Sequence, residues 1–147
     1  MSFLGKVKKK LRNGSWYPFY NTFYEKNGLD PRMILLESRS GKALESNILS
    51  LLKELCKEPY HKFTLVLSVH KSVEQEIREK LHKNSITGVH FVRTGSVAYY
   101  RALSRAGYLV NDSSFPGRFV KKEGQIYLNT WHGTPLKKMG RDNRPEM

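Results

Sequence analysis

Short apolar runs alternate with amphipathic stretches along most of this chain. Each run is bounded by polar residues, glycine or proline, as is typical of buried strands. We therefore expect strands at Met33–Glu37, Phe63–Val69, Val89–Val92, Tyr108–Val110 and Ile126–Leu128.

Between these runs, apolar residues recur at helical spacing. The stripes predict helices within Leu44–Leu55, Val73–Leu81 and Ser96–Ala106. The first stripe stops before Pro59, Ser72 with Gln75 predicts a capping box for the second, and Gly107 predicts a C-terminal cap for the third. Strands and helices are thus expected to alternate along the chain.

This alternation predicts right-handed βαβ units and an α/β fold with a Rossmann-like parallel sheet. Ligands of such folds bind at the carboxyl ends of the strands. The polar turns Ser38–Lys42, Asn111–Ser114 and Trp131–Thr134 are expected at that edge. We assign residues 33–147 to this domain and residues 1–32 to a separate N-terminal segment.

The N-terminal segment is basic and aromatic. Residues 1–13 hold five cations and no acid, with apolar residues at helical spacing, and an aromatic cluster follows at residues 16–24. This composition is typical of an anchor on a membrane surface. A helix docked on its own domain, with solvated lysines, explains the pattern equally well.

The charge balance narrows the class of partner. Lysine and arginine number 26 against 13 acidic residues, giving a formal net charge of +13, so we expect an anionic partner: nucleic acid, acidic lipid headgroups or a phosphorylated substrate. Cys56 is the only cysteine, which excludes an internal disulfide and favours a reducing compartment. No apolar run approaches the roughly 18 residues of a membrane span, and no apolar region follows the basic start as in a secretory signal.

The most informative stretch follows the last predicted strand. His132 stands in a polar turn beside Gly133, which allows close approach of a ligand to the backbone. Thr134 and Pro135 predict a helix N-cap and first helical position. A helix N-terminus favours phosphate, and Lys137 adds positive charge nearby.

Arg141 adds a further cation, so the turn favours chemistry on a phosphate. From the residues alone, His132 is either a catalytic base or an ordinary turn residue. Asp112, after another predicted strand, either orients an imidazole or a substrate hydroxyl, or makes an Asx turn. Lys121 and Lys122 are interpreted as solvated hairpin charges.

The sequence contains no motif of a P-loop, a serine hydrolase or a zinc site. Gly41 and Lys42 lack the remaining residues of a P-loop, and no Gly-x-Ser-x-Gly elbow is present. One cysteine and five dispersed histidines give no zinc spacing, so we expect no metal and no cofactor. The four histidines other than His132 are expected at the surface or at strand edges; they are His61, His70, His82 and His90.

Residues 111–116, 119–125 and 128–137 together resemble the CDP-glycerol glycerophosphotransferase family. The Trp-His-Gly-Thr-Pro run at 131–135 is the most specific part of the match. The resemblance is dense from 96 to 142 and looser from 33 to 95. Members of this family build teichoic acid on a lipid carrier at the inner face of the bacterial cell membrane.

The resemblance implies the N-terminal, acceptor-side half of a GT-B enzyme. His132 would be the general base, with Gly133, Thr134, Lys137, Arg141 and Asp112 as candidate substrate-binding residues. The family's C-terminal half carries a second histidine-glycine motif and most CDP-glycerol contacts. We expect that half to be missing, so that this chain is a fragment, inactive alone.

The expected partners are therefore CDP-glycerol, a lipid-linked glycerol phosphate acceptor and an anionic membrane surface. The expected location is peripheral, on the cytoplasmic side of the cell membrane. Two alternatives remain: a non-catalytic half-domain that binds membrane or acceptor, and a basic nucleic-acid-binding α/β module. The aromatic cluster lies apart from the strands, which disfavours nucleic acid.

Overall fold

The computed structural model describes residues 17–117 and 119–131. At its centre is a parallel sheet whose five strands lie in the order β3-β2-β1-β4-β5. The strands are β1 (Asp30–Glu37), β2 (Thr64–Val69), β3 (Val89–Arg93), β4 (Ala106–Asn111) and β5 (Ile126–Asn129). All five expected strands are present, and the predicted Rossmann-like fold class is confirmed.

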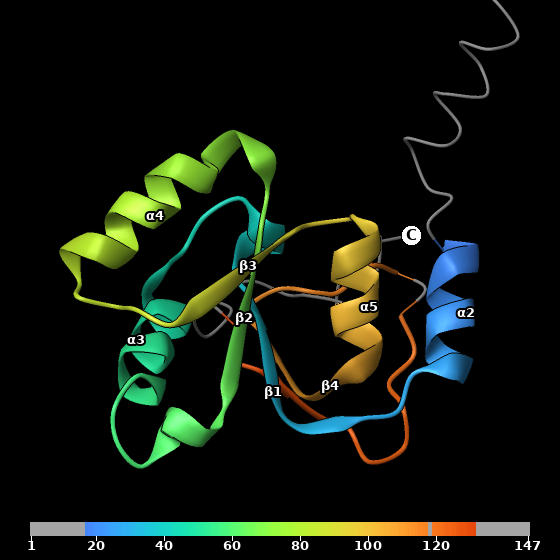
Figure 1. The fold of residues 1–147 in the computed structure, drawn as a ribbon. Helices are drawn as coiled ribbons and strands as arrows, with labels where there is room; N and C mark the ends of the chain where they lie inside the picture. Colours follow the sequence, from blue (N-terminus) through green and yellow to red (C-terminus); the bar gives the residue numbers. More distant parts are fainter. Residues whose placement is uncertain (1–16, 118, 132–147) are drawn as a thin grey trace, which may run out of the picture.

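Helices cover both faces of the sheet among the described residues. They are α2 (Tyr17–Lys26), α3 (Ser46–Leu55), α4 (Glu74–Lys83) and α5 (Val97–Arg105). Figure 1 shows α3 and α4 on one side of the strands and α5 and α2 on the other. The three predicted helical stripes correspond to α3, α4 and α5.

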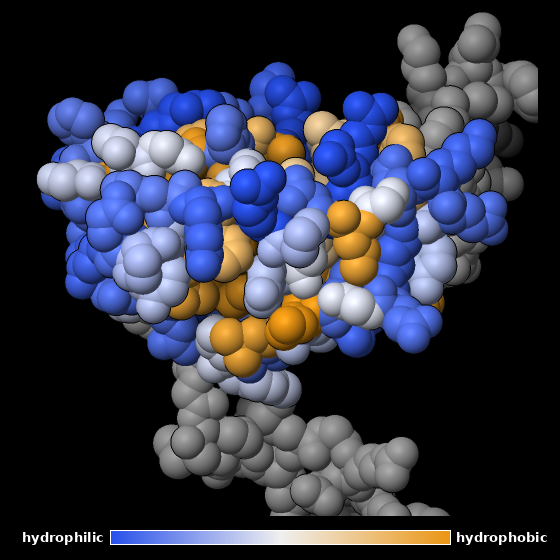
Figure 2. Space-filling view, turned by 60° about the horizontal axis from the view of Figure 1, so that its bottom comes forward, coloured by the Kyte–Doolittle hydropathy of each residue, from blue (hydrophilic) through white to orange (hydrophobic). Residues whose placement is uncertain are grey.

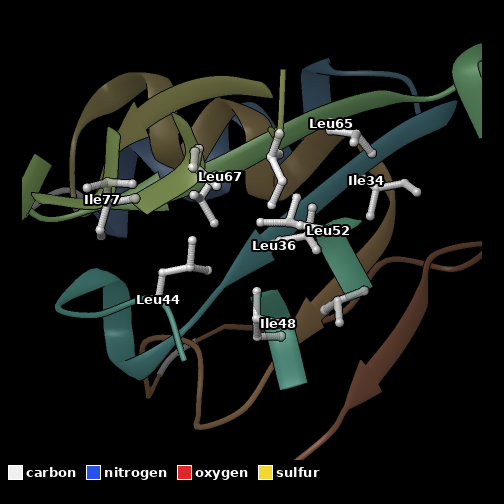
Figure 3. Packing of buried hydrophobic residues seen from close by; sticks show 12 residues of the cluster. Ile34, Leu36, Leu44, Ile48, Leu52, Leu65, Leu67 and Ile77 are labelled. Carbon is white, nitrogen blue, oxygen red and sulfur yellow. The ribbon is translucent and has the colours of Figure 1, made fainter. Parts of the chain in front are cut away.

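Alternation of side chains along the strands builds two separate cores. On the α3 and α4 side, Ile34 and Leu36 of β1 pack with residues such as Ile48 and Ile77. Figure 3 shows strand and helix side chains converging in this cluster. On the other face, Leu35 packs in a second cluster with residues of α5. Each face is apolar because the strands are covered on both sides.

Helix α2 adds to the second core. The ring of Tyr20 is 2% exposed, and its hydroxyl donates to the Val120 carbonyl at 2.8 Å. The described part of the aromatic segment is therefore docked on the sheet domain through α5. Residues 1–16 lie outside the described residues, so the anchor interpretation of residues 1–13 stays a prediction. The domain boundary after residue 32 also stays a prediction.

The start of α4 differs from the prediction. The expected capping box at Ser72 is wrong, because a 3₁₀ turn at Lys71–Val73 comes first and α4 begins at Glu74. The His70 ring is the acceptor instead: its Nδ1 accepts from the Ser72 backbone N–H and lies 2.8 Å from Ser72 Oγ.

The end of α5 also differs. Gly107 does not cap the helix but lies inside β4, which starts directly after α5 ends at Arg105. A Cβ on Gly107 would lie 2.9 Å from the Asp30 carbonyl oxygen. Glycine is therefore required by the close approach of β1, which a local sequence signal does not reveal.

Lys122 is buried rather than solvated, in contrast to the prediction. Its Nζ donates to the Asn27 carbonyl at 2.6 Å, just beyond the C-terminus of α2, and lies 5.0 Å from the centre of the Tyr24 ring. A cation is favoured at the negative end of a helix dipole. His61, His70, His82 and His90 are exposed, as expected.

Figure 2 shows a face that is largely hydrophilic, with scattered hydrophobic patches. Within the described ranges, no helix is long and apolar enough to cross a membrane.

Candidate functional site at the carboxyl edge of the sheet

The strand order of the sheet reverses its direction between β1 and β4. Strands β2 and β3 extend from one side of β1, whereas β4 and β5 extend from the other. Such a switch point opens a crevice at the carboxyl ends of the two central strands. Here Glu37 ends β1 and Asn111 ends β4, and the two are paired in register.

The side chain of Asp112, which follows β4, is hydrogen-bonded to the loop that follows β1. Its side chain is almost fully buried, at 2% exposure. One carboxylate oxygen accepts from Ser38 Oγ at 2.6 Å and the other from the Arg39 backbone N–H at 2.8 Å. Ser38 Oγ in turn accepts from the Glu45 backbone N–H at 3.1 Å. Asp112 therefore holds the loop after β1 in place.

That loop makes a left-handed turn. Arg39, Ser40 and Gly41 have φ angles of 48°, 54° and 77°. The Gly41 carbonyl accepts from the His70 backbone N–H at 2.7 Å. A Cβ on Gly41 would collide with Thr94 Oγ1. The turn is thus packed against the ends of β2 and β3, and only glycine fits at its third position.

Glu37 lies buried beneath this loop, with 1% of its surface exposed. Burial raises the pKa of its carboxyl group. The hydroxyls of Ser68 and Tyr99 oppose that rise in the pKa, and the nearby charge of Asp112 adds to it. Burial also raises the pKa of Tyr99, which keeps its hydroxyl protonated.

Four buried polar atoms make no well-formed hydrogen bond within the part of the chain that the structure describes. They are Glu37 Oε2, Tyr99 Oη, Asn111 Nδ2 and Ser113 Oγ. Native proteins leave few such groups, and they concentrate where polar chemistry or bound water is needed. All four belong to the carboxyl edge of β1 and β4 or to the first turn of α5.

The turn that leads towards His132 is also anchored at this edge. The Thr130 backbone N–H donates to the Asn111 carbonyl at 2.8 Å. The Trp131 backbone N–H donates to Asn129 Oδ1 at 2.9 Å, and the Trp131 carbonyl accepts from Asn47 Nδ2 at 2.8 Å. Trp131 has a φ of 50°, which is rare for a bulky residue.

Three predicted parts of the site are accordingly brought together. The loops after β1 and β4 touch through Asp112, and the turn after β5 is bonded to the end of β4. His132, Gly133, Thr134, Lys137 and Arg141 lie outside the described residues, so their roles stay predictions. The described residues contain no group of three or more His, Cys, Asp or Glu side chains placed to hold a metal.

Sequence reasoning missed the buried carboxyl group of Glu37 and the two asparagines that contact Trp131. An acid directly after the apolar run at 33–36 was a usable signal for Glu37. Asn47 gave none, because Trp131 lies far from it in the sequence. Asn129 accepts from a backbone N–H only two residues further along, as in an Asx turn, so its contact was open to a local prediction.

A separate hollow lies between α4 and the outer edge of β3. It has a volume of about 420 Å³, and its lining includes Arg78, His82 and Phe91. The Arg78 guanidinium lies 4.1 Å from the centre of the Phe91 ring. None of the residues predicted for chemistry lines this hollow.

The chain is similar in sequence to known bacterial polymerases. The chain is 30% identical over 137 residues to the teichoic acid poly(glycerol phosphate) polymerase of Staphylococcus epidermidis, covering 92% of this chain and 17% of that protein. It is 28% identical over 144 residues to the polymerase of the same description from Bacillus subtilis, covering 95% and 18%. The chain therefore spans about a fifth of the length of these relatives.

Among solved structures, the chain is similar to a teichoic acid polymerase. The structure of the wall teichoic acid polymerase TagF matches with a TM-score of 0.67 at 25% identity, covering 98% of this chain and 35% of that one. A TagF structure soaked with CDPG matches with a TM-score of 0.65 at 26% identity, covering 98% and 35%. The sequence profile of the family described as CDP-glycerol:poly(glycerophosphate) glycerophosphotransferase matches residues 18–147. This chain belongs to that family.

Proposed function

We propose that this chain forms the acceptor-side half of a transferase that moves glycerol phosphate from CDP-glycerol to a hydroxyl group of a lipid-linked teichoic acid primer or chain. Family membership and the names of the relatives support the reaction class. The TagF structure soaked with CDPG supports the donor. Contacts to CDP-glycerol would come largely from a second half, as in the GT-B arrangement.

In this reaction the acceptor oxygen attacks the phosphorus that carries glycerol. A new oxygen–phosphorus bond forms, the bond to the CMP oxygen breaks, and CMP leaves. The protein's task is positioning and charge neutralisation. In the proposal, His132 takes the acceptor proton, which contributes about 10²–10⁴ in rate.

The remaining candidate residues hold the substrates. Gly133 and Thr134 offer backbone N–H groups at the start of the expected helix, and Lys137 and Arg141 neutralise phosphate. Asp112 acts in this scheme by holding the loop after β1, since both its oxygens accept hydrogen bonds there.

The single observation that carries the proposal is the convergence at the carboxyl edge. The β1 loop, the end of β4 and the turn before His132 are hydrogen-bonded to one another. A parallel sheet binds ligands at this edge, at this switch point. The basic residues of 1–13 would place the site near an anionic membrane, which makes the protein peripheral on the cytoplasmic side. Nucleic acid is not among the proposed partners.

A second candidate is an acceptor-binding half-domain without catalysis of its own. The hydrogen-bonded carboxyl edge supports acceptor binding whether or not this chain takes part in catalysis. The two candidates differ in transfer activity but not in acceptor binding.

The test measures both properties with purified protein in which this chain is joined to the second half of the proposed GT-B enzyme. Transfer of labelled glycerol phosphate from CDP-glycerol is assayed on liposomes that contain a lipid-linked glycerol phosphate primer, and liposome binding is measured by flotation. We expect His132→Ala to lower transfer at least 100-fold with binding retained, and the exposed control His90→Ala to leave both unchanged. Primer-dependent binding without transfer supports the half-domain. If the unmodified protein shows neither transfer nor primer-dependent binding, the proposal is refuted.

A further inference from the structure

We propose that two copies of this chain associate through the outer edge of β3 and the adjacent face of α4. A two-fold axis perpendicular to the sheet would pass beside Phe91, so that the two sheets join into one and both α4 helices lie on the same face. This association is independent of the proposed reaction.

Strand β3 lies at one end of the strand order, so only one of its sides is paired within the described sheet. The Thr94 backbone N–H, directly after β3, donates to the Val69 carbonyl of β2 at 3.1 Å. Backbone groups of successive strand residues point to opposite sides. Counting back from Thr94, the N–H groups of Val89, Phe91 and Arg93 therefore point away from β2. Such an edge is a template for a further strand.

The outward groups of β3 fit antiparallel pairing with a second β3. In an antiparallel pair, opposite residues that exchange two backbone hydrogen bonds alternate with residues that exchange none. With the axis beside Phe91, the outward groups of Phe91 meet those of Phe91 in the second copy, and Val89 meets Arg93. The Arg93 carbonyl also accepts from the Ser96 N–H at 3.0 Å, so the Arg93 N–H would be the main partner of Val89.

Helix α4 brings one polar face to this edge. The hollow of about 420 Å³ between α4 and β3 continues into a second hollow of about 430 Å³, and Arg78 lines both. The second hollow is lined by helix residues alone: Gln75, Arg78, Glu79, His82 and Lys83. Positions 75, 78, 79 and 82 have the spacing of one helix face. That face of α4 is therefore open beside the edge of β3.

The charges of this face are self-complementary when α4 is set antiparallel to a copy of itself. Glu74 is in the first turn of the helix and Lys83 in the last, with Arg78 and Glu79 at its middle. In an antiparallel pair centred between residues 78 and 79, Arg78 of each copy faces Glu79 of the other, and Glu74 faces Lys83. Each contact occurs twice, as an isologous interface requires. Opposite charges meet at all of these positions, which favours this partner and this orientation.

Arg78 can bind within its own copy and across the axis. Its guanidinium lies 4.1 Å from the centre of the Phe91 ring, and its Nη2 lies 2.8 Å from a Glu74 oxygen of the same helix. The side chain is still 50% exposed. A guanidinium carries five N–H donors, so Arg78 can keep Glu74 and also bind Glu79 of the second copy.

The sheet would also set the two helices at packing distance. Helix α4 packs through Ile77 and Leu81 against residues of both β2 and β3, such as Leu67 and Phe91, so its axis lies about half a strand spacing inward of β3. Neighbouring strands are about 4.8 Å apart, which puts the two α4 axes about 10 Å apart across the joined edges. Packed helices have axes about 8–10 Å apart.

The first test is the mass of the full chain in solution, measured by sedimentation equilibrium. A reducing agent is present, because Cys56 could otherwise link two copies. Each copy carries a net charge of +13, so the salt concentration is about 0.15 M, where the Debye length is about 8 Å. We expect the mass to rise with protein concentration from 17.1 kDa towards twice that value. A constant 17.1 kDa up to about 1 mM protein would overturn the proposal.

The second test reverses one charge in each of two variants. Glu79→Lys sets a lysine opposite Arg78, and Arg78→Glu sets a glutamate opposite Glu79, so each variant alone should associate at least about 10-fold more weakly. In an equimolar mixture, unlike charges face each other again at both contacts, and a mixed dimer should form about as tightly as the unmodified one. The matched controls are Glu54→Lys and Lys57→Glu, an exposed ion pair of 2.7 Å at the end of α3. Both controls should associate like the unmodified chain.

A mixture that stays monomeric although both variants keep the circular dichroism of the unmodified chain would contradict the pairing of α4. So would unchanged association of each variant alone. If either variant unfolds, Glu74→Lys and Lys83→Glu test the other charge pair in the same way, with the same reading of the mixture.

The third test locates the surface by amide hydrogen exchange at several protein concentrations. The Phe91 amide points to the outer edge, whereas the Val92 amide points to β2. Protection of the Phe91 amide should rise with the dimer fraction, and protection of the Val92 amide should not. A dimer that leaves the exchange of Phe91 unchanged would use another surface, and the proposal would be wrong.

Discussion

Replacing Gly41 by alanine tests the packing of the loop that borders the site. Gly41 has a φ of 77°, and its neighbours at the ends of β2 and β3 leave no room for a side chain. A Cβ there would collide with Thr94 Oγ1 and lie 3.1 Å from the His70 backbone nitrogen. The backbone nitrogen cannot move without weakening its hydrogen bond to the Gly41 carbonyl.

Two costs add in Gly41→Ala. A left-handed φ costs a residue with a Cβ about 1–2 kcal/mol. Forcing a methyl group into packed surroundings costs about 1–3 kcal/mol more. The free energy of unfolding should therefore fall by about 2–5 kcal/mol.

Gly88→Ala is a matched control. Gly88 has nearly the same φ, 73°, but no atom lies within 4 Å of its added Cβ. It should lose only the conformational part, about 1–2 kcal/mol. Urea unfolding of both variants, followed by circular dichroism, isolates the steric part as their difference.

The Thr94 side chain provides a second check. Thr94→Ala removes the colliding oxygen, so it should recover part of the stability lost in Gly41→Ala, by about 1 kcal/mol after correction for its own effect. Equal losses in Gly41→Ala and Gly88→Ala, within about 0.5 kcal/mol, would show that the loop does not pack against Thr94 as described.

Two further predictions concern buried acids at the same edge. Asp112→Ala leaves Ser38 Oγ and the Arg39 N–H without their acceptor, so the free energy of unfolding in urea should fall by about 1–3 kcal/mol. The control Asp30→Ala removes an exposed acceptor of the Arg32 N–H and should cost clearly less. Equal losses would contradict the role of Asp112 in holding the loop after β1. Burial raises the folded-state pKa of Glu37 above its ordinary 4.5, so the folded state holds its proton more tightly and stability should decline as the pH rises from 4.5 through the raised pKa. Glu37→Gln should lack this decline when melting temperatures are compared across that range, and parallel pH curves for the two proteins would count against burial of an ionisable carboxyl group.

The main elements could be predicted because their signals are local. A buried parallel strand must be apolar on both faces, so the runs at β1 and β2 stand out in the sequence. The stripes of α3 and α4 show the helical period that burial of one face requires. The expected carboxyl edge followed from strand–helix alternation alone.

The contacts that build the site could not be predicted in the same way. Asp112 binds Ser38 because β4 lies beside β1, and no local pattern determines which strands are neighbours. The same holds for Lys122, whose partner at Asn27 lies far away in the sequence. His70 caps the turn before α4 with its ring, although Ser72 carried the stronger local signal.

The sheet register links the core to the site. Leu35, Val66 and Leu109 are neighbours on one face, and two residues further along lie Glu37, Ser68 and Asn111, also neighbours in register. Asn111 is in turn paired with Asn129 of β5. We call these four residues, Glu37, Ser68, Asn111 and Asn129, the polar row. Successive residues of a strand face opposite sides, so residues two apart share a face.

This geometry explains why the polar row is held at one level. A slip of one residue in β1 would turn Leu35 away from its apolar cluster and bring Leu36 into its place, exchanging the two cores. The apolar residues therefore fix the register, and the register fixes the height of Glu37 and Asn111. The loop tied by Asp112 and the turn bonded to Asn111 both start from that row. The burial that stabilises the sheet thus also sets the position of the groups at its carboxyl edge.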